Sequence, residues 1–492
     1  MKKLSLLLLT ILALRAHAAE HVVLVVWDGL RPDSVNGTNT PTLAKLAREG
    51  VFFANHHAVY VSSTEVNGVT LATGAYPART GILANREYRT AIDPLKSVAI
   101  ESPETIRKAD ELTTGHYLGL PTLPEILRAA GRTVAVVGAK PIAKLFDRKR
   151  PESFVSTSKF AAPNTKTDIE ATSRLIGGLW DNGVPSFSLL WLSEPDVSQH
   201  DSGLGSPKAL AALRGSDQNL ARVFDELQAK GVRDKTDVLV VSDHGFSTAS
   251  RTVDLAAVLT NAGFAATREF KKAPKPGEIL IVELGGSAMF YVIGHDPVAT
   301  RKLVEFLQQQ DFTGVIFTRE PLPGTFRLEA ARMDTIDAPD IVVALRWSAD
   351  PGSNGVLGMV VSDAGRAPGQ GVHASLSRFD MRNTLIAVGP DFRRGMTNSL
   401  PTGNADVAPT ILSILGVKPE HATEGRELSE ALVGRAFPKV PVVLRTLEAT
   451  CDVGARRWHQ YLRVIEVAGV TYLDEGNGSS QVVHSEEKPV TP

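Results

Sequence analysis

Runs of mostly apolar residues recur along the chain, with helix-like segments between them. Such a run has no polar face, so each one predicts a strand that is buried on both faces of a parallel sheet. The runs are Val22 to Trp27, Thr133 to Val137, Phe187 to Leu192, Val238 to Val241 and Thr384 to Val388.

The segments between these runs carry apolar residues at helical spacing. Between Pro41 and Gly50, for example, Leu43 and Leu46 share one face of a predicted helix. Further helices are predicted over Leu123 to Ala130, from a cap at Ser216 to Gly231, and after a cap at Asn404. Strands that alternate with helices predict an α/β fold, in which a doubly wound, mainly parallel sheet has helices on both faces.

The pattern changes between residues 261 and 370, where short strand patterns surround one predicted helix near Val298 to Gln309. We interpret this part as a small α+β cap inserted into a main domain of residues 19–260 and 371–440. Residues 87–119 are predicted to form a long loop or lid beside the sheet. At the C-terminal end we expect a hairpin within residues 441–475 and a disordered tail over residues 476–492.

The first 18 residues have the pattern of a secretory signal peptide. Lys2 and Lys3 precede an apolar run, and Ala16-His17-Ala18 offers the small residues of a cleavage site. Cleavage is expected after Ala18, because the apolar run is too short to span a bilayer. No later segment has the length and apolarity of a membrane span, and the signal is typical of export to a bacterial periplasm.

Composition narrows the possible chemistry. The 492 residues include 53 Lys and Arg against 54 Asp and Glu, so the chain has no overall basic field to hold a nucleic-acid duplex. The balanced charge is still compatible with a small anionic substrate. Cys451 is the single cysteine, which excludes an intramolecular disulfide and a cysteine-based metal site. Histidine and carboxylate side chains are left as candidate metal ligands.

Acidic and histidine side chains follow several predicted strands. In open α/β sheets ligands bind beyond the carboxyl ends of the strands, so these side chains are expected to converge. The set comprises Asp28, Asp196, His200, Asp243, His244 and His373. Three carboxylates at one sheet edge would raise one another's pKa unless cations neutralise them. The set therefore predicts two divalent metal ions, with zinc favoured and manganese or iron permitted.

Six motifs surround these residues in a specific order. They are Val25 to Arg31, Ser62 to Asn67 with Leu71 to Gly74, Glu194 to His200, Ser242 to Gly245, Gly371 to His373 and Asn404 to Thr410. In these motifs the chain resembles the alkaline phosphatase superfamily, and most closely its nucleotide pyrophosphatase/phosphodiesterase branch. The resemblance covers most of the chain after residue 18. It implies that the main domain is an alkaline-phosphatase-like catalytic domain that hydrolyses phosphoric esters.

The resemblance also implies roles for individual residues. Thr64 lies 36 residues after Asp28, where the family has its nucleophile, and Asn85 lies 21 residues further on, where the family has a phosphate-binding asparagine. A threonine hydroxyl is a weak nucleophile unless a cation stabilises its alkoxide, and a phospho-threonine intermediate is expected. The implied metal ligands are Asp196, His200 and His373 for one ion, and Asp28, Thr64, Asp243 and His244 for the other.

The sequence specifies the class of phosphoric ester that is hydrolysed less closely than it specifies the metal ligands. No basic residue adjoins Thr64, and the neutral Asn85 favours a phosphodiester or a pyrophosphate such as a nucleotide. Glu65, where the family more often has an apolar or aromatic residue, indicates a different leaving-group pocket. A phosphomonoesterase or phosphonate hydrolase would need a basic clamp from Lys140, Lys144, Lys271 or Lys272. A non-catalytic, metal-stabilised binding protein is a further alternative, and the oligomeric state is left open.

Overall fold

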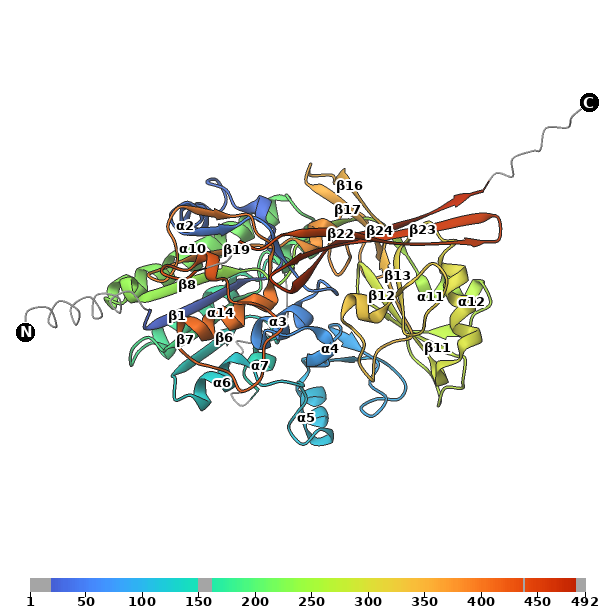
Figure 1. Ribbon diagram of the computed structural model, residues 1–492, viewed down its shortest axis with the longest axis horizontal. Helices are drawn as coiled ribbons and strands as arrows, with labels where there is room; N and C mark the ends of the chain where they lie inside the picture. The colour runs from blue at the N-terminus through green and yellow to red at the C-terminus, as the bar shows by residue number, and fades with distance from the viewer. Residues whose placement is uncertain (1–18, 149–161, 437–438, 484–492) are drawn as a thin grey trace, which may run out of the picture.

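The computed structural model describes residues 19–148, 162–436 and 439–483 (Figure 1). The predicted signal peptide, residues 1–18, lies outside the described residues. Figure 1 shows a central sheet flanked by helices, a cap beside it, and a long C-terminal sheet that runs over both. Within the described ranges, no helix combines the length and the apolarity that a membrane crossing requires.

A seven-stranded sheet forms the centre of the main domain, in the order β20-β2-β19-β8-β1-β7-β6. Its strands are β1 (His21–Trp27), β2 (Val51–Phe53), β6 (Val134–Gly138), β7 (Phe187–Leu192), β8 (Thr236–Val241), β19 (Leu385–Val388) and β20 (Met396–Asn398). The strands β6, β7, β1 and β8 are parallel, whereas β19 is antiparallel to both neighbours. Alternate residues of β1 pack into two different hydrophobic cores, as a strand buried on both faces requires.

Helices cover both faces of this sheet, which confirms the predicted doubly wound architecture. They are α2 (Pro41–Glu49), α3 (Thr64–Thr73), α6 (Leu123–Ala129), α7 (Ala143–Phe146), α8 (Thr165–Arg174), α10 (Pro207–Ala229) and α14 (Val407–Ile414). Side chains of α2, α8 and α10 join the core on one face, and those of α3, α6, α7 and α14 join the core on the other.

Two predicted helix caps are wrong. The helix α10 begins at Pro207 and is capped by the Ser206 side chain, whereas Ser216 lies buried inside it. The Ser216 hydroxyl donates to the carbonyl of Glu194 instead. Asn404 begins a short 3-10 turn and does not cap the helix that follows. In both cases a polar side chain that could cap a helix serves a tertiary contact.

A six-stranded sheet in the order β10-β11-β12-β15-β13-β14 forms the cap. Its elements are β10 (Ala266–Thr267), β11 (Ile279–Glu283), β12 (Ser287–Val292), α12 (Pro297–Leu307), β13 (Thr313–Thr318), β14 (Phe326–Arg327) and β15 (Ile341–Leu345). The helix α12 and α11 (Leu255–Asn261) pack on one face of this sheet. Tyr60 and Leu83 of the main domain pack on the other face, so the cap is fixed beside the central sheet.

Part of the range predicted for the cap belongs to another sheet. The strands β16 (Trp347–Pro351) and β17 (Leu357–Asp363) join β9 (Ser247–Val253) and β18 (Gly371–Val372) in a four-stranded sheet. The segment predicted as a long loop or lid also carries regular structure. It contains β4 (Arg86–Glu87), which pairs with β5 (Val98–Ala99), and α5 (Pro103–Leu112).

The C-terminal region is a three-stranded antiparallel sheet of β22 (Val443–Val453), β23 (Arg456–Val467) and β24 (Val470–Val482). The predicted hairpin therefore has a third strand, and the disordered tail predicted from residue 476 is wrong up to Val482. The run Gly476 to Ser480 has no apolar alternation, but its backbone pairs with β23. Residues 484–492, the rest of the predicted tail, lie outside the described part of the chain.

The C-terminal sheet joins the cap to the main domain. Trp458 of β23 packs in the cap core, and the Gln460 side chain exchanges two hydrogen bonds with the backbone of Ile316 in β13. Asp474 of β24 contacts Arg382 and His57 of the main domain. The sheet is thus a strap across the two parts (Figure 1).

Truncation of Trp458 is expected to loosen this strap. The indole is fully buried, and its Nε1 donates to the carbonyl oxygen of Gly324 at 2.9 Å. Removing a buried aromatic side chain costs about 3–5 kcal/mol in the free energy of unfolding. Urea unfolding of Trp458→Ala should show that loss, and Trp458→Phe should lose clearly less. An alanine variant as stable as the wild type would contradict this account.

Candidate functional site

The candidate site lies beyond the carboxyl ends of β1, β7 and β8, which are neighbours in the central sheet. Asp28 directly follows β1, and Asp243 and His244 follow β8. The strand β7 leads into α9 (Asp196–Ser202), whose first residue is Asp196 and whose next turn carries His200. Parallel strands end at the same edge of a sheet, which is why residues far apart in the sequence converge here.

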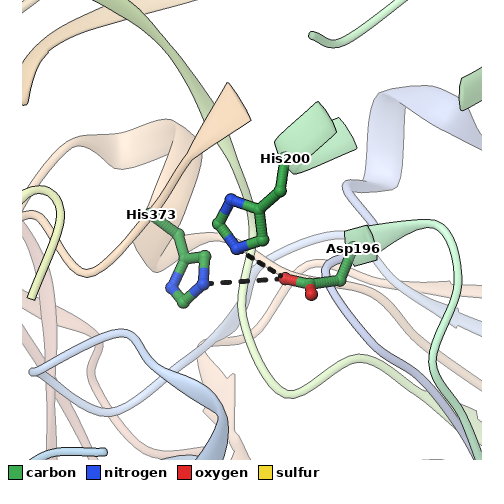
Figure 2. Close-up of side chains that lie close together, drawn as sticks. All are labelled: Asp196, His200 and His373. Carbon is green, nitrogen blue, oxygen red and sulfur yellow. Dashed lines mark ion pairs between the residues drawn. The ribbon is translucent and has the colours of Figure 1, made fainter. Parts of the chain in front are cut away.

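His373 follows β18 and completes a first cluster with Asp196 and His200 (Figure 2). The Nε2 atoms of His200 and His373 lie 3.3 and 3.6 Å from Asp196 Oδ1. Figure 2 shows the two imidazoles meeting this one carboxylate oxygen from different elements. One ligand atom from each residue lies within 4.8 Å of the others, a spacing that suits one metal ion.

Asp28, Asp243, His244 and Thr64 form a second cluster. His244 Nε2 lies 3.3 Å from Asp243 Oδ2, 3.6 Å from Asp28 Oδ1 and 3.4 Å from Thr64 Oγ1. Ligand atoms of Asp28, Asp196 and His244 also lie within 4.8 Å of one another. The His244 and His373 rings stack with centroids 3.8 Å apart, so the two clusters are in contact.

Each of the three histidines is oriented by a backbone carbonyl. The Nδ1 atoms of His200, His244 and His373 lie 2.8–2.9 Å from the carbonyl oxygens of Gly371, Gly245 and Ser62, respectively. A carbonyl only accepts hydrogen bonds, so Nδ1 carries the hydrogen and the Nε2 lone pair faces the carboxylates. This is the arrangement in which a neutral imidazole serves as a metal ligand.

Burial determines the protonation of the cluster. Burial and then the neighbouring Asp243 raise the pKa of Asp28 well above its ordinary value. Burial and the other imidazoles lower the pKa of His373, and burial lowers the pKa of His200 despite the contact with Asp196. These imidazoles are therefore neutral at neutral pH, and a neutral imidazole is the form that binds metal.

Lys140 enters the site although the sequence analysis gave it no specific place. It lies two residues after β6, and its Nζ is 2.9 Å from Asp28 Oδ1 and 2.6 Å from Asp196 Oδ2. Burial alone would lower the pKa of Lys140, but Asp196 and Asp28 raise it, so the ammonium stays charged. Its position just after a predicted strand is the signal that the sequence offers, and the order of the strands in the sheet separates it from Lys271 and Lys272, which are exposed.

One ammonium does not satisfy the three carboxylates. Within the described ranges, Asp28 Oδ1, Asp196 Oδ1 and Asp243 Oδ2 are buried oxygens that accept no hydrogen bond. Their close contacts are with the Lys140 ammonium or with the imidazole nitrogens of the site. Buried oxygens without donors beside neutral imidazole nitrogens fit divalent cations that take mixed oxygen and nitrogen ligands.

Thr64 is the first residue of α3, and its side chain is buried beside His244. The two neighbouring hydroxyls have other surroundings. Ser62 Oγ donates to the carbonyl oxygen of Ser375 at 2.8 Å, and Ser63 is the residue immediately before the helix. Among these three hydroxyls, the Thr64 hydroxyl is the one that contacts a predicted metal ligand.

Asn85 is brought to the same helix start. Its Oδ1 accepts a hydrogen bond from the backbone amide of Glu65 at 3.2 Å, so the donor end of the amide is the one suited to a substrate oxygen. The Glu65 side chain is buried, and burial together with Glu101 raises the pKa of its carboxyl well above the ordinary value. A carboxyl whose burial disfavours its charged form therefore follows the candidate nucleophile.

One supporting residue, Trp191, lies outside the motif set, and two backbone amides from within the motifs support the site as well. Trp191 of β7 donates from Nε1 to Asp28 Oδ2 at 2.9 Å, and the backbone amides of Gly29 and His244 each donate to Asp243 Oδ1 at 3.0 Å. These contacts aim the opposite oxygens of the two carboxylates into the site. Trp191 could not be singled out in the sequence, because it stands in an apolar run that predicts a buried strand.

A buried carboxylate also holds the loop that carries Asp196. Asp168 of α8 accepts hydrogen bonds from the backbone amides of Ser193 at 2.7 Å and Glu194 at 3.1 Å. The Glu194 carboxylate in turn accepts from the Ser198 amide at 2.9 Å in the first turn of α9. The turn between β7 and α9 is therefore determined by hydrogen bonds on both sides of Asp196.

A pocket of about 420 Å³ opens onto His200 and His373. Its two acidic side chains are already partnered: Arg268 pairs with Glu283 at 2.6 Å, and the Gly285 and Gly365 amides donate to Asp363. The remaining polar lining is Ser63, Asn85, Arg86 and Arg366. The pocket can therefore take an anionic or polar group beside the first cluster.

Comparison with known proteins identifies a family pattern over most of the chain. Residues 22–352 match the model of the type I phosphodiesterase / nucleotide pyrophosphatase family. This range includes each of the predicted site residues except His373. The chain is 26% identical over 236 residues to mouse ectonucleotide pyrophosphatase/phosphodiesterase family member 3, and 26% identical over 234 residues to a venom phosphodiesterase of Crotalus durissus collilineatus.

These matches cover 46% of this chain and about a quarter of the length of each relative, 25% and 26%. Among solved structures, murine ectonucleotide pyrophosphatase/phosphodiesterase 5 superposes with a TM-score of 0.63 and 17% sequence identity. That match covers 84% of this chain and 99% of the murine chain. The murine protein shares the fold, and it is an inactive threonine-to-alanine variant in complex with AMP.

Divalent cations are expected to stabilise the protein through the two clusters. A cation that binds the folded state alone adds about 2.7 kcal/mol at a hundredfold excess over its dissociation constant. Zinc added to chelator-treated protein should therefore raise the melting temperature, and Asp243→Asn should reduce that gain. Asp363→Asn, a buried carboxylate in the pocket wall, is the matched control and should keep it. Equal melting curves with and without zinc would count against the metal site.

Proposed function

Because the chain belongs to the type I phosphodiesterase / nucleotide pyrophosphatase family, we propose that it hydrolyses phosphodiester and pyrophosphate bonds in small substrates such as nucleotides. The observation that carries the proposal is the Thr64 hydroxyl, which lies 3.4 Å from His244 Nε2 where two metal-compatible clusters meet. The proposal includes export to a bacterial periplasm with cleavage after Ala18, on the pattern of the first 18 residues.

Two divalent cations, zinc by preference, are part of the proposal. The donor set supports them, because imidazole nitrogens and carboxylate oxygens alternate around the two clusters. When bound, such ions stabilise a threonine alkoxide and the negative charge that develops on the leaving oxygen. The residues that would hold them are Asp196, His200 and His373 for one ion, and Asp28, Thr64, Asp243 and His244 for the other.

The proposed reaction has two displacements at phosphorus. Thr64 Oγ1 loses its proton and attacks the phosphorus, and the bond from phosphorus to the leaving oxygen breaks. Water then attacks the phospho-threonine, the bond from phosphorus to Oγ1 breaks, and Thr64 regains a proton. Asn85 and the Thr64 amide would hold a non-bridging oxygen, which the positive end of the α3 dipole also favours.

The murine relative supports this assignment in two respects. Its inactive variant replaces a threonine by alanine, and its complex contains AMP. A threonine is the proposed nucleophile here, and a nucleotide belongs to the proposed substrate class. The pocket beside His200 and His373 offers space for the leaving group, because those residues belong to the cluster away from Thr64.

Phosphomonoester hydrolysis is the second candidate activity, and Lys140 is the observation that favours it. The absence of a basic neighbour at Thr64 in the sequence favoured a diester, but an ammonium lies between Asp28 and Asp196. Divalent cations on these carboxylates would compete with that ammonium and release it toward the substrate. A monoester dianion gains more from an added cation than a diester monoanion does.

Thr64→Ala is expected to lower kcat/KM on bis(p-nitrophenyl) phosphate by about 10³-fold or more, because the covalent route is lost with the nucleophile. Zinc content and melting temperature should stay close to those of the wild type. Ser63→Ala removes the adjacent hydroxyl and is the matched control, which should retain turnover. Unchanged turnover in Thr64→Ala would exclude Thr64 as the nucleophile, and no turnover in the zinc-loaded wild type would favour a binding protein.

Lys140→Ala tests which ester the site prefers. If the ammonium contacts a monoester dianion, its removal should lower kcat/KM on p-nitrophenyl phosphate by about 10- to 100-fold, the effect of one charge-assisted hydrogen bond. The loss on bis(p-nitrophenyl) phosphate should be clearly smaller. Lys271→Ala, an exposed lysine of the cap, is the control and should change neither substrate. Equal losses of kcat/KM on both esters would indicate that Lys140 positions the carboxylates and does not contact the charged oxygens of the substrate.

A further inference from the structure

A second group of carboxylates lies at the opposite end of the strands that carry Asp28 and Asp243. The backbone nitrogen of Ala19 donates to Asp391 Oδ2 at 2.7 Å, two residues before β1 begins. Ala19 is 8% exposed, so this contact is shielded from solvent. The contact joins the start of β1 to the loop that follows β19.

The strand register fixes the position of Ala19. The next residue, Glu20, donates from its backbone nitrogen to the carbonyl of Lys235 at 2.8 Å, and its carboxylate pairs with the Lys235 ammonium at 2.9 Å. His21 then pairs with Thr236 as the first rung between β1 and β8. The nitrogen of Ala19 is therefore held beside the start of β8 by contacts that do not involve Asp391.

Asp391 is one half of a carboxyl pair. The Asp391 amide donates to Oδ1 of the fully buried Asp237 at 3.2 Å, and Asp237 Oδ2 has no hydrogen-bond partner in the described part of the chain. Burial and the neighbouring Asp391 raise the pKa of Asp237 to about 8. A side chain at Gly389 would meet Asp237 Oδ1 at 2.1 Å, so glycine is required for this close approach.

Side-chain cations do not neutralise this pair. Among residues 19–148, 162–436 and 439–483, the ion pairs of the structure include none with Asp237 or Asp391. The nearby Arg233 donates to the carbonyl of Thr236 and lies over the Phe224 ring, 4.8 Å from its centroid. The charge of Arg233 still lowers the pKa of Asp237, against the larger effect of burial. In the described part of the chain, the two carboxyls therefore face a backbone nitrogen and a nearby arginine, without a direct ion pair to either.

We propose that hydrolysis of the bond between Ala18 and Ala19 supplies the missing cation. The cleavage consumes one water and leaves a carboxylate on Ala18 and an amine on Ala19, which takes up a proton at neutral pH. The resulting α-ammonium forms an ion pair with the half-buried Asp391 beside Asp237. Removal of the signal peptide thus converts a neutral amide contact into an internal salt bridge and stabilises the processed chain. The proposal rests on the cleavage after Ala18 that is part of the proposed function, and the pairing does not depend on the reaction at the other edge of the sheet.

The ion pair acts on the strands that form the site. The strand β1 begins two residues after Ala19 and is followed by Asp28. Asp237 is the second residue of β8, and Asp243 lies two residues after the end of β8. Anchoring the amino ends of both strands opposes fraying of the central pair in the sheet. A precursor that keeps its leader has an uncharged amide at this place and lacks that anchor.

The test compares a chain that starts at Ala19 with a chain that carries Gly-Ser before Ala19, each alone and with Asp391→Asn. The extension replaces the ammonium by an amide and keeps every side chain. It is expected to lower the melting temperature by about 2–4 °C in the wild-type background and to have little effect in Asp391→Asn. Asp234→Asn, an exposed neighbour, is the matched control and should keep the full shift. Equal melting temperatures of the two chains, or an undiminished shift in Asp391→Asn, would overturn the proposal.

A second measurement needs no substitution. The pKa of the Ala19 α-amine, followed by the pH dependence of its acylation in the chain that starts at Ala19, is expected above the ordinary range of about 7.7–8.0. An amine that is buried against a carboxylate should also react more slowly than an exposed terminus. A pKa within the ordinary range and fast acylation would overturn the proposal even if Asp391→Asn did not fold.

Discussion

The convergence of three carboxylates at one buried sheet edge is the constraint on which the rest of the site depends. Asp28, Asp196 and Asp243 each follow a strand of the central sheet, and the parallel arrangement leaves them no way to diverge. Like charges at this separation in a low-dielectric interior repel strongly. Burial first, and then the charge of Asp243, raise the pKa of Asp28. Such an edge is stable only with positive charge, which Lys140 supplies in part and divalent cations would complete.

The surrounding residues make the carboxylates rigid and leave their inner oxygens without donors. Trp191 and two backbone amides bind the outer oxygens of Asp28 and Asp243, and carbonyls hold each imidazole in one tautomer. The pattern directs every unsatisfied ligand atom to a common volume. Without a cation, the inner carboxylate oxygens of such a site lack hydrogen-bond donors, which destabilises the folded state. Binding of a cation to these oxygens offsets that loss of free energy.

Much of the fold and of the site could be predicted, because both follow from strand periodicity and strand ends. An apolar run predicts a buried strand, and an acidic residue just after the run predicts a metal ligand, as for Asp28 and Asp243. The prediction failed where tertiary contacts override a local signal. Ser216 has the chemistry of a helix cap but bonds to another element, and Gly476 to Ser480 has no strand pattern but pairs along β23.

Lys140 was harder to place for a different reason. A lysine near the end of a strand is common, and its contribution depends on which strand lies next to it. Only the order β1-β7-β6 shows that Lys140 reaches Asp28 and Asp196. The sequence contains the strand and the lysine, but it does not contain the neighbour relation. The order of the strands in the sheet is therefore the information that identifies Lys140 as the site residue among the four candidate lysines.

The central strands carry carboxylates at both ends, and each end meets its charge requirement differently. Asp237 is the second residue of β8, Asp243 lies two residues after its end, and β1 pairs with β8 along its whole length. At the carboxyl end the acids face imidazoles and Lys140, a donor set that an external cation can enter. At the amino end the acids face a backbone nitrogen and no site for a metal is formed by the described residues. Arg233 acts on Asp237 there without a direct ion pair, and a covalent change in the chain itself would add a second positive charge. Export processing and metal loading would then act on opposite ends of the same two strands.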